Sequence, residues 1–261
     1  MIDYAPVGRV LVALSKRSVS TQFRRAQLVM PTFVLPLMLM AVITSGTGAA
    51  RDLPGYPTVD SYLSFIIAGS IIQGALLAGL TTGIALASDI ESGFFDRLLA
   101  APVPRSTLVL GRLSGTVVLG VIQSAFFLAV AFVFGASYPG GPLAILATIC
   151  LAALTAAGIG GLAAAIALRT GSLSLMQSIF PFVFVLLFTA PAFFPRELLT
   201  DTLRDVAVYN PLTYVVEGAR GLLGGNRELG DPWLGLAAAV GLVIATTVLA
   251  TAALQERLRR T

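Results

Sequence analysis

Residues 88–112 read SDIESGFFDRLLAAPVPRSTLVLGR and hold six charged residues, in a chain of 261 that has only 17 basic and 13 acidic ones. On both sides of this stretch the sequence continues for long distances without a charge. Charged residues make up 11% of the chain and hydrophobic residues 56%, whereas a soluble domain is about 25% charged. The chain is therefore predicted to be a membrane protein in which residues 88–112 form a polar loop.

Five uncharged runs predict the membrane spans, at residues 26–50, 61–88, 113–168, 170–195 and 232–255. A helix needs about 20 apolar residues to cross the hydrocarbon core, so four runs provide one span each and the longest provides two. The longest run is interrupted by GASYPGGP, whose glycines and prolines are typical of a turn. We predict a single all-α transmembrane domain over residues 1–261, with six transmembrane helices.

The basic residues predict the orientation. The two termini, the loop at 88–112 and the region around Arg169 hold 12 of the 17 lysines and arginines. Basic residues gather in cytoplasmic loops, and an even number of spans places both termini on one side. Both termini are therefore predicted to be cytoplasmic, and residues 196–231 extracytoplasmic. The net charge of +4 then reflects orientation and contact with anionic lipids rather than nucleic-acid binding.

Two further segments are expected to lie at the membrane surfaces. Residues 5–25 are predicted to form an amphipathic interfacial helix; the alternative is a basic leader exposed to solvent. Residues 196–231 mix helical periodicity with charges and predict short re-entrant helices before the last span. The polar face of the first segment carries Arg9, Lys16, Arg17, Ser20 and Arg24, and its apolar face carries Val7, Leu11, Val12, Leu14, Val19 and Phe23.

Several kinds of chemistry are excluded by residue inventory. The chain has no histidine and a single cysteine, Cys150, which argues against a histidine-containing metal site or a Ser-His protease. Lys16, the only lysine, follows no glycine-rich loop, so the chain is not a P-loop ATPase. The uncharged runs also lack the buried carboxylates of proton-coupled carriers. We therefore predict a non-catalytic subunit whose energy source lies on another protein.

Gln73, inside the second span, is expected either to form an interhelical hydrogen bond or to contact substrate.

The charged loop is predicted to contain a short helix. Asp89 and Glu91 are expected to cap the end of the second span, and FFDRLLAAP then gives a helix that is stopped by Pro102 and Pro104. Exposed aromatic residues on such a helix indicate a docking element, and the alternative is an ordinary interfacial re-entry helix. Its apolar side carries Phe94, Phe95, Leu98 and Leu99, and its polar side Asp96 and Arg97.

Two motifs carry a family resemblance. ESGFFDRLLAAPVPR resembles the E-x-G-x-x-x-R-L-L-x-x-P-V-x-R pattern of permease subunits in type-two ATP-binding-cassette exporters, especially the bacterial drug-resistance branch typified by the daunorubicin exporter. APAFFPRELL and NPLTYVVEGARGLL are similar to that family's fifth-span exit and to its N-P-L-T-x-x-x-E-x-x-R segment. The motifs and the six-span plan agree in order over nearly the whole chain.

The resemblance implies a permease that exports a hydrophobic or amphipathic substrate, such as a drug, lipid or glycoconjugate, across the bacterial cytoplasmic membrane. ATP and Mg²⁺ are expected on a separate ATPase subunit, and a second permease subunit, identical or related, completes the pathway. A secondary carrier or channel and a non-transporting membrane scaffold are the alternatives.

The resemblance also assigns residues. The ATPase-coupling helix is implied at Glu91, Gly93, Phe94, Phe95, Asp96, Arg97, Leu98, Leu99, Pro102 and Arg105. The outer segment carries Asn210, Pro211, Glu217 and Arg220, and the last two are spaced as an i, i+3 pair, which either shapes an exit gate or closes the loop. Candidates for the substrate path are Phe65, Gln73, Met176, Phe180, Phe184 and Phe188, for which packing against the core or lipid is the alternative.

Overall fold

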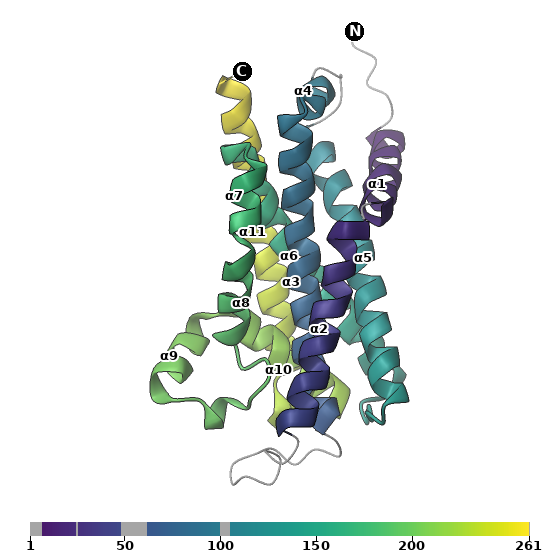
Figure 1. The fold of residues 1–261 in the computed structure, drawn as a ribbon, viewed down its shortest axis with the longest axis vertical. Coiled ribbons are helices and arrows are strands. Elements are labelled where there is room, and N and C mark those ends of the chain that lie inside the picture. Colours follow the sequence, from purple (N-terminus) through teal and green to yellow (C-terminus); the bar gives the residue numbers. More distant parts are fainter. Residues whose placement is uncertain (1–6, 25, 48–61, 100–104, 261) are drawn as a thin grey trace.

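The structure is a computed structural model that describes residues 7–24, 26–47, 62–99 and 105–260. Within these residues every regular element is a helix and none is a strand, which confirms the predicted all-α class. Most of the helices run along the long axis of an elongated bundle (Figure 1). They are α1 (Val7–Arg24), α2 (Ala26–Thr47), α3 (Tyr62–Glu91), α4 (Phe94–Leu99), α5 (Arg105–Val133), α6 (Gly141–Thr170), α7 (Leu173–Ser178), α8 (Phe180–Phe188), η2 (Arg196–Leu198), α9 (Asp201–Tyr209), α10 (Pro211–Gly224), η3 (Arg227–Leu229) and α11 (Pro232–Arg260).

Five of the described helices are long and apolar enough to cross a membrane, so the chain is a multi-pass membrane protein. They correspond to α2, α3, α5, α6 and α11, each inside one of the uncharged runs or extending slightly beyond it. The predicted turn within the longest run is confirmed, because α5 ends at Val133 and α6 begins at Gly141. The charge-free runs therefore located these long helices.

The run at 170–195 departs from the single span that the sequence predicts. It contains two short helices, α7 and α8, which are stacked end to end beside α3 (Figure 1) and separated at Ile179. Pro181 explains the interruption, because proline has no N–H to donate and its ring clashes with the carbonyl four residues earlier. The two helices together extend over about 24 Å, less than the roughly 30 Å of the hydrocarbon core. This membrane segment is a broken helix.

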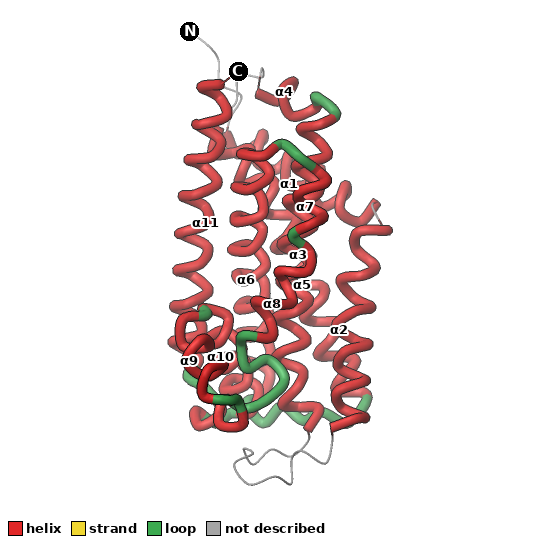
Figure 2. Tube along the Cα trace, turned by 60° about the vertical axis from the view of Figure 1, so that its left-hand side comes forward, coloured by secondary structure: helices red, strands yellow, loops and turns green. Residues whose placement is uncertain are grey.

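Helix α3 is the centre of the bundle. Within its most apolar stretch 94% of residues are buried inside the protein, against 22% for α2 and 22% for α11. Other helices surround α3 in the rotated view (Figure 2). The outward faces of α2 and α11 expose apolar side chains such as Met38 and Ile244, which suit contact with lipid. Helix α3 therefore contacts most of the other helices of the bundle.

The two ends of the bundle carry different elements. Helix α4 and the last turns of α11 lie at one end, and α9 and α10 lie at the opposite end (Figures 1 and 2). We refer to these as the α4 end and the α10 end. The short helices predicted before the last span are present as α9 and α10, and α10 is packed against α11, α6 and α3.

The predicted amphipathic segment forms α1, near the α4 end. Its polar face is exposed as expected, at Arg9, Lys16, Arg17, Ser20 and Arg24. Helix α1 packs mainly along α5, where Leu14 is half-buried. Gln22 is buried and donates a hydrogen bond to Thr82 of α3, whereas Phe23, predicted on the apolar face, is exposed.

Candidate coupling site and transport path

A glycine turn connects α3 to α4. Gly93 has a φ of +66°, and its N–H donates to the carbonyl oxygen of Ile90 over 3.0 Å. Side chains with a Cβ disfavour this left-handed conformation, which is why glycine commonly terminates a helix. The turn ends α3 and starts the predicted short helix, which is confirmed as α4. Pro102 of the same motif lies outside the described residues, and Arg105 is the first residue of α5.

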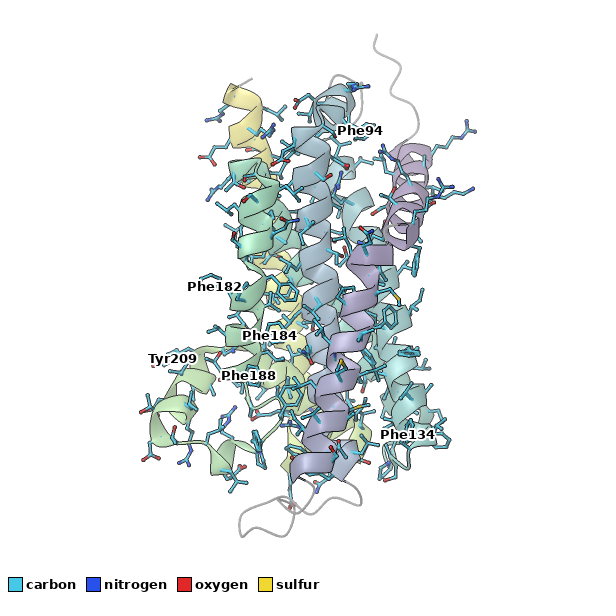
Figure 3. The ribbon with its side chains drawn as sticks, in the orientation of Figure 1. Phe94, Phe134, Phe182, Phe184, Phe188 and Tyr209 are labelled. Atoms are coloured by element: carbon cyan, nitrogen blue, oxygen red, sulfur yellow. The ribbon has the colours of Figure 1, made fainter. Side chains whose placement is uncertain are left out.

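The apolar side of α4 faces its own bundle. Phe95 is only 4% exposed and belongs to the main core, while Leu98 and Leu99 are half-buried. Phe94, labelled in Figure 3, is half-buried beneath Arg17, whose guanidinium carbon lies 3.8 Å from the ring centroid. The expectation of exposed aromatic residues is therefore wrong for Phe95, because burying a phenylalanine removes a large apolar area from water.

The side of α4 that is exposed to solvent is charged. Asp96 and Arg97 are both exposed, as predicted for the polar side of the helix. Asp96 also lies 3.7 Å from the guanidinium of Arg257 near the end of α11. The exposed surface of α4 is therefore polar, with half-buried apolar residues behind it.

The two acids that precede α4 make tertiary contacts. They were expected to cap the end of α3, but a negative charge is unfavourable at a helix C-terminus. Asp89 instead forms an ion pair with Arg112 of α5 at 2.5 Å. A Glu91 carboxylate oxygen accepts a hydrogen bond of 2.7 Å from the backbone N–H of Leu173, the first residue of α7. Glu91 therefore joins the α3–α4 turn to the start of the broken helix.

At the α10 end, Asn210 explains the N-P pair of the second motif. Its side-chain oxygen accepts from the N–H of Leu212 at 3.0 Å, which caps α10, and Pro211 occupies the first turn where no N–H is needed. Its side-chain nitrogen donates to the carbonyl oxygen of Leu186 at 2.8 Å and to the hydroxyl of Thr189 at 3.0 Å. One buried side chain thus starts α10 and binds it to the end of α8.

Glu217 and Arg220 lie on α10 with the predicted spacing, but their hydrogen bonds reach other segments. Glu217 accepts two from Arg196, at 3.0 and 2.9 Å. Burial raises the pKa of the Glu217 carboxyl above its usual value, opposed by the positive charges of Arg196 and Arg220. Each residue therefore links α10 to a different part of the chain, in addition to their mutual electrostatic interaction.

Arg220 is the most buried arginine of this cluster, with 3% exposure. It donates to the carbonyl oxygen of Phe65 at 3.2 Å and to that of Ala192 at 2.6 Å. Its guanidinium carbon also lies 3.6 Å from the centroid of the Phe65 ring. A Cβ at Gly69 would stand 2.0 Å from the Ala192 oxygen, so only glycine permits this approach. Arg220 and Gly69 together hold the chain after α8 against α3.

The candidate path residues fall into two groups. Phe65, Gln73 and Met176 are buried within the single chain, and neither polar atom of the Gln73 amide has a hydrogen-bond partner among the described residues. Phe180, Phe184 and Phe188 form a ladder along α8, with successive ring centroids 5.6 and 6.5 Å apart. The structure brings these three together, whereas the first group is buried in the core.

The outer face of α8 includes a residue that the sequence reasoning missed. Phe182 is 64% exposed and points away from the bundle in Figure 3, and Val185 and Leu186 are also exposed. The signal was present, because Phe182 lies in the same aromatic run as the ladder. No cluster of histidine, cysteine, aspartate or glutamate suited to a metal ion occurs among the described residues.

These features define a helical multi-pass membrane protein with a polar junction at each end of a broken membrane helix. Comparison with known proteins specifies the class. The family model described as ABC-2 type transporter matches residues 9–223, so this chain belongs to the ABC-2 type transporter family. Both motifs lie within the matched residues.

Individual relatives agree with the family assignment. The chain is 27% identical to transport permease ycf38 of Porphyra purpurea over 210 residues, covering 80% of this chain and 72% of that protein. It is 23% identical to the daunorubicin resistance ABC transporter permease protein DrrB1 of Streptomyces coeruleorubidus, with coverage of 80% and 73%. It is 22% identical to the doxorubicin resistance ABC transporter permease protein DrrC of Mycobacterium tuberculosis, with coverage of 80% and 74%. Their names support a membrane subunit of an ABC transporter.

Proposed function

We propose that this chain is the permease subunit of an ABC exporter and moves a hydrophobic or amphipathic substrate out of the cytoplasm or the inner leaflet. The observation that carries the proposal is the hydrogen bond from Leu173 to Glu91, which connects the α3–α4 turn to the broken helix. ATP and Mg²⁺ bind to a separate ATPase subunit, and this chain contributes no catalytic residue. The charge distribution supports a bacterial cytoplasmic membrane with the α4 end on the cytoplasmic side.

In this mechanism the ATPase pushes on the exposed side of α4, at Asp96 and Arg97. Glu91 passes the displacement to α7. The interruption at Ile179 lets α7 tilt, while Asn210 holds the opposite end of α8 in place. The broken helix then changes its shape instead of moving as one rod.

A second permease subunit, identical or related, completes the pathway. The exposed residues Phe182, Val185 and Leu186 provide an apolar face on α8 for that subunit or for substrate. The neighbouring ladder of Phe180, Phe184 and Phe188 supports a hydrophobic path, because aromatic rings offer large apolar surfaces without a charge. A drug, a lipid or a lipid-linked glycan would suit such a surface.

The test begins with purification of the tagged chain from its native membrane and identification of the proteins that accompany it. We expect an ABC ATPase subunit, and the reconstituted complex should transport a fluorescent anthracycline into inside-out vesicles only when ATP is present. Arg97→Glu should weaken binding of the ATPase, whereas the charge-matched control Arg227→Glu, exposed at the α10 end, should not. A complex without any ATPase, or transport that is independent of ATP, would refute the proposal.

A further inference from the structure

A groove lies between α1 and the rest of the bundle at the α4 end. Residues of α1, α2, α3, α4 and α5 line it, and none comes from α7 or α8. It is therefore separate from the proposed substrate path. Most of its lining is apolar, with Val29, Ala85 and Leu108 contributing from three different helices.

The position of α1 over this groove is fixed by close packing on α5. The Cβ of Leu14 lies 2.7 Å from the place where a Cβ of Gly111 would be. A Cβ at Gly115 would likewise clash with the Ser18 side chain. Small residues at this four-residue spacing allow helix backbones to approach closely. The Ser18 hydroxyl also donates to the carbonyl oxygen of Arg112 at 2.9 Å. The groove therefore lies beneath a closely packed helix and is not a gap beneath a loosely attached one.

A buried polar group without a partner lines the groove. Gln22 is 8% exposed, and its side-chain nitrogen donates to the Thr82 hydroxyl at 3.4 Å, which is hydrogen-bonded in turn to Thr116. Its side-chain oxygen has no partner among the described residues. If the side-chain amide is flipped by half a turn, the nitrogen becomes the atom without a partner. In either orientation, one polar atom of the Gln22 amide has no hydrogen-bond partner among the described residues. A buried amide atom in this state is costly and favours a ligand with a hydroxyl group, which can donate or accept.

The charges that line the groove favour an anion. Asp89 and Arg112 form an ion pair at 2.5 Å, which leaves Arg17 as the excess positive charge. Arg17 is exposed and stacks on Phe94, and no carboxylate partner is found for it within the described chain. A guanidinium held in this way can bind a phosphate by paired hydrogen bonds.

We infer that this groove binds the headgroup of an anionic phospholipid that carries a hydroxyl, as phosphatidylglycerol does. The phosphate contacts Arg17, the headgroup hydroxyl contacts the Gln22 amide, and the acyl chains cover the apolar lining. The site is chemically independent of transport and relies on the proposed function only for its assignment to the cytoplasmic leaflet. Failure of the transport proposal would therefore leave the lipid site intact.

Occupation of the groove also affects α4. Phe95 and Leu98 are part of its lining, so a bound lipid packs against the inner side of the helix whose outer side is open to a partner. A lipid at this site supports the position of α4. Loss of the lipid is expected to make α4 more mobile without altering α8 or α10.

The experiment measures lipid that stays bound after purification. The full chain, with any subunits that accompany it, is reconstituted in vesicles of phosphatidylcholine and phosphatidylglycerol, extracted in mild detergent and weighed by native mass spectrometry. We expect phosphatidylglycerol to be retained in preference to phosphatidylcholine. Arg17→Gln should reduce this retention at least about fivefold, the effect of one arginine at an anionic surface. The matched control Arg9→Gln removes the same charge from an exposed position of α1 outside the groove and should behave as wild type.

A second variant tests the cavity without changing charge. Ala85→Phe fills the groove from α3 and should also reduce retention, with the folded state checked by thermal unfolding. The two variants are expected to lower retention at unchanged monodispersity. Equal retention of both lipids, an equal loss in Arg17→Gln and Arg9→Gln, or full retention in Ala85→Phe would overturn the inference. Displacement of the lipid by millimolar inorganic phosphate alone would also overturn it, because that result would indicate a site for free phosphate.

Discussion

The α10 end and the α4 end both rely on polar side chains, but these side chains differ in their exposure to solvent. At the α10 end Arg220 is 3% exposed and Asn210 is also buried, and each makes several hydrogen bonds. At the α4 end the Asp96 side chain is 54% exposed and its contact with Arg257 is 3.7 Å long. Arg169 and Glu256 form another ion pair at that end, and both side chains are about half exposed.

This difference has consequences for movement. Exposed ion pairs contribute roughly 0 to 1 kcal/mol to the free energy of unfolding, because water competes for both partners. Hydrogen bonds to a charged group contribute about 1.5–3 kcal/mol, and breaking them in a buried site leaves partners unsatisfied. The α4 end also contains the Asp89–Arg112 pair, whose side chains are only 16% and 19% exposed. The broken helix itself, however, is attached by the buried Asn210 at the α10 end and by the exposed Glu91 at the α4 end, so its attachment is fixed at the first and adjustable at the second. Such an arrangement suits a protein that is driven from the α4 end.

The largest effect is expected from Arg220→Met, which keeps the length of the side chain but removes its donors. The carbonyl oxygens of Phe65 and Ala192 lose their hydrogen bonds inside the protein. We expect a loss of about 3 kcal/mol in the free energy of unfolding, measured by denaturant titration in mixed micelles. Arg220→Lys should restore part of it, since lysine keeps the charge but not the planar fork.

The control for this change is Arg227→Met. Arg227 is an exposed arginine in η3 at the same end of the molecule. Its substitution should alter the free energy of unfolding by less than about 0.5 kcal/mol. Similar losses in the two variants would show that burial does not determine how much an arginine contributes to stability. The contrast between the two ends, which rests on burial, would then fail.

An intermediate effect is expected from Glu217→Gln, and it should depend on pH. Because burial raises the pKa of Glu217, the folded state holds the proton more tightly than the unfolded state does. Stability therefore falls as the pH rises from the ordinary pKa of glutamate through the raised value. The glutamine variant lacks this slope and, because its neutral amide avoids the cost of burying a carboxylate, should be at least as stable as the wild type at neutral pH despite its weaker contact with Arg196.

Thermal unfolding of both proteins between about pH 4 and pH 7 measures this prediction. The difference in melting temperature between wild type and variant should change across the acidic part of that range and become constant above it. A difference that is the same at every pH would show that Glu217 does not titrate differently in the folded protein.

Much of the fold could be predicted from local sequence. Charge-free runs located the long helices, and the apolar spacing of FFDRLLAAP before Pro102 and Pro104 located α4. The pair Asn210 and Pro211, assigned only from the family resemblance, lies at the start of α10, and such a cap could be predicted because it depends on neighbours within a few residues. These features share one property: the interaction that decides them is local.

Features that depend on distant residues could not be predicted in the same way. Nothing near Phe95 in the sequence shows that the core will cover it, since the covering residues come from other helices. The hydrogen-bond partners of Glu91 and Glu217 lie 82 and 21 residues away. The interruption of the fifth run is an intermediate case, because Pro181 was visible but its effect depends on whether a neighbouring helix supports the freed carbonyl groups. The sequence thus indicated where the motif residues lie along the chain, but not which distant residues they contact.

The smallest effect on stability is expected from Glu91→Ala at the α4 end. The change removes a solvent-exposed carboxylate that caps α7 through the N–H of Leu173, so the loss in the free energy of unfolding should be about 0.5–1 kcal/mol. Glu91→Asp keeps the charge but shortens the reach, and Glu228→Ala removes an exposed acid from the α10 end as a control. If Glu91 connects α4 to the broken helix, Glu91→Ala and Glu91→Asp should both leave ATP hydrolysis by the partner largely intact while transport falls several-fold, and Glu228→Ala should change neither. Proportional losses of hydrolysis and transport in Glu91→Ala would indicate a defect in assembly instead, and the α4 end would then be a simple attachment point with no role in passing movement to α7.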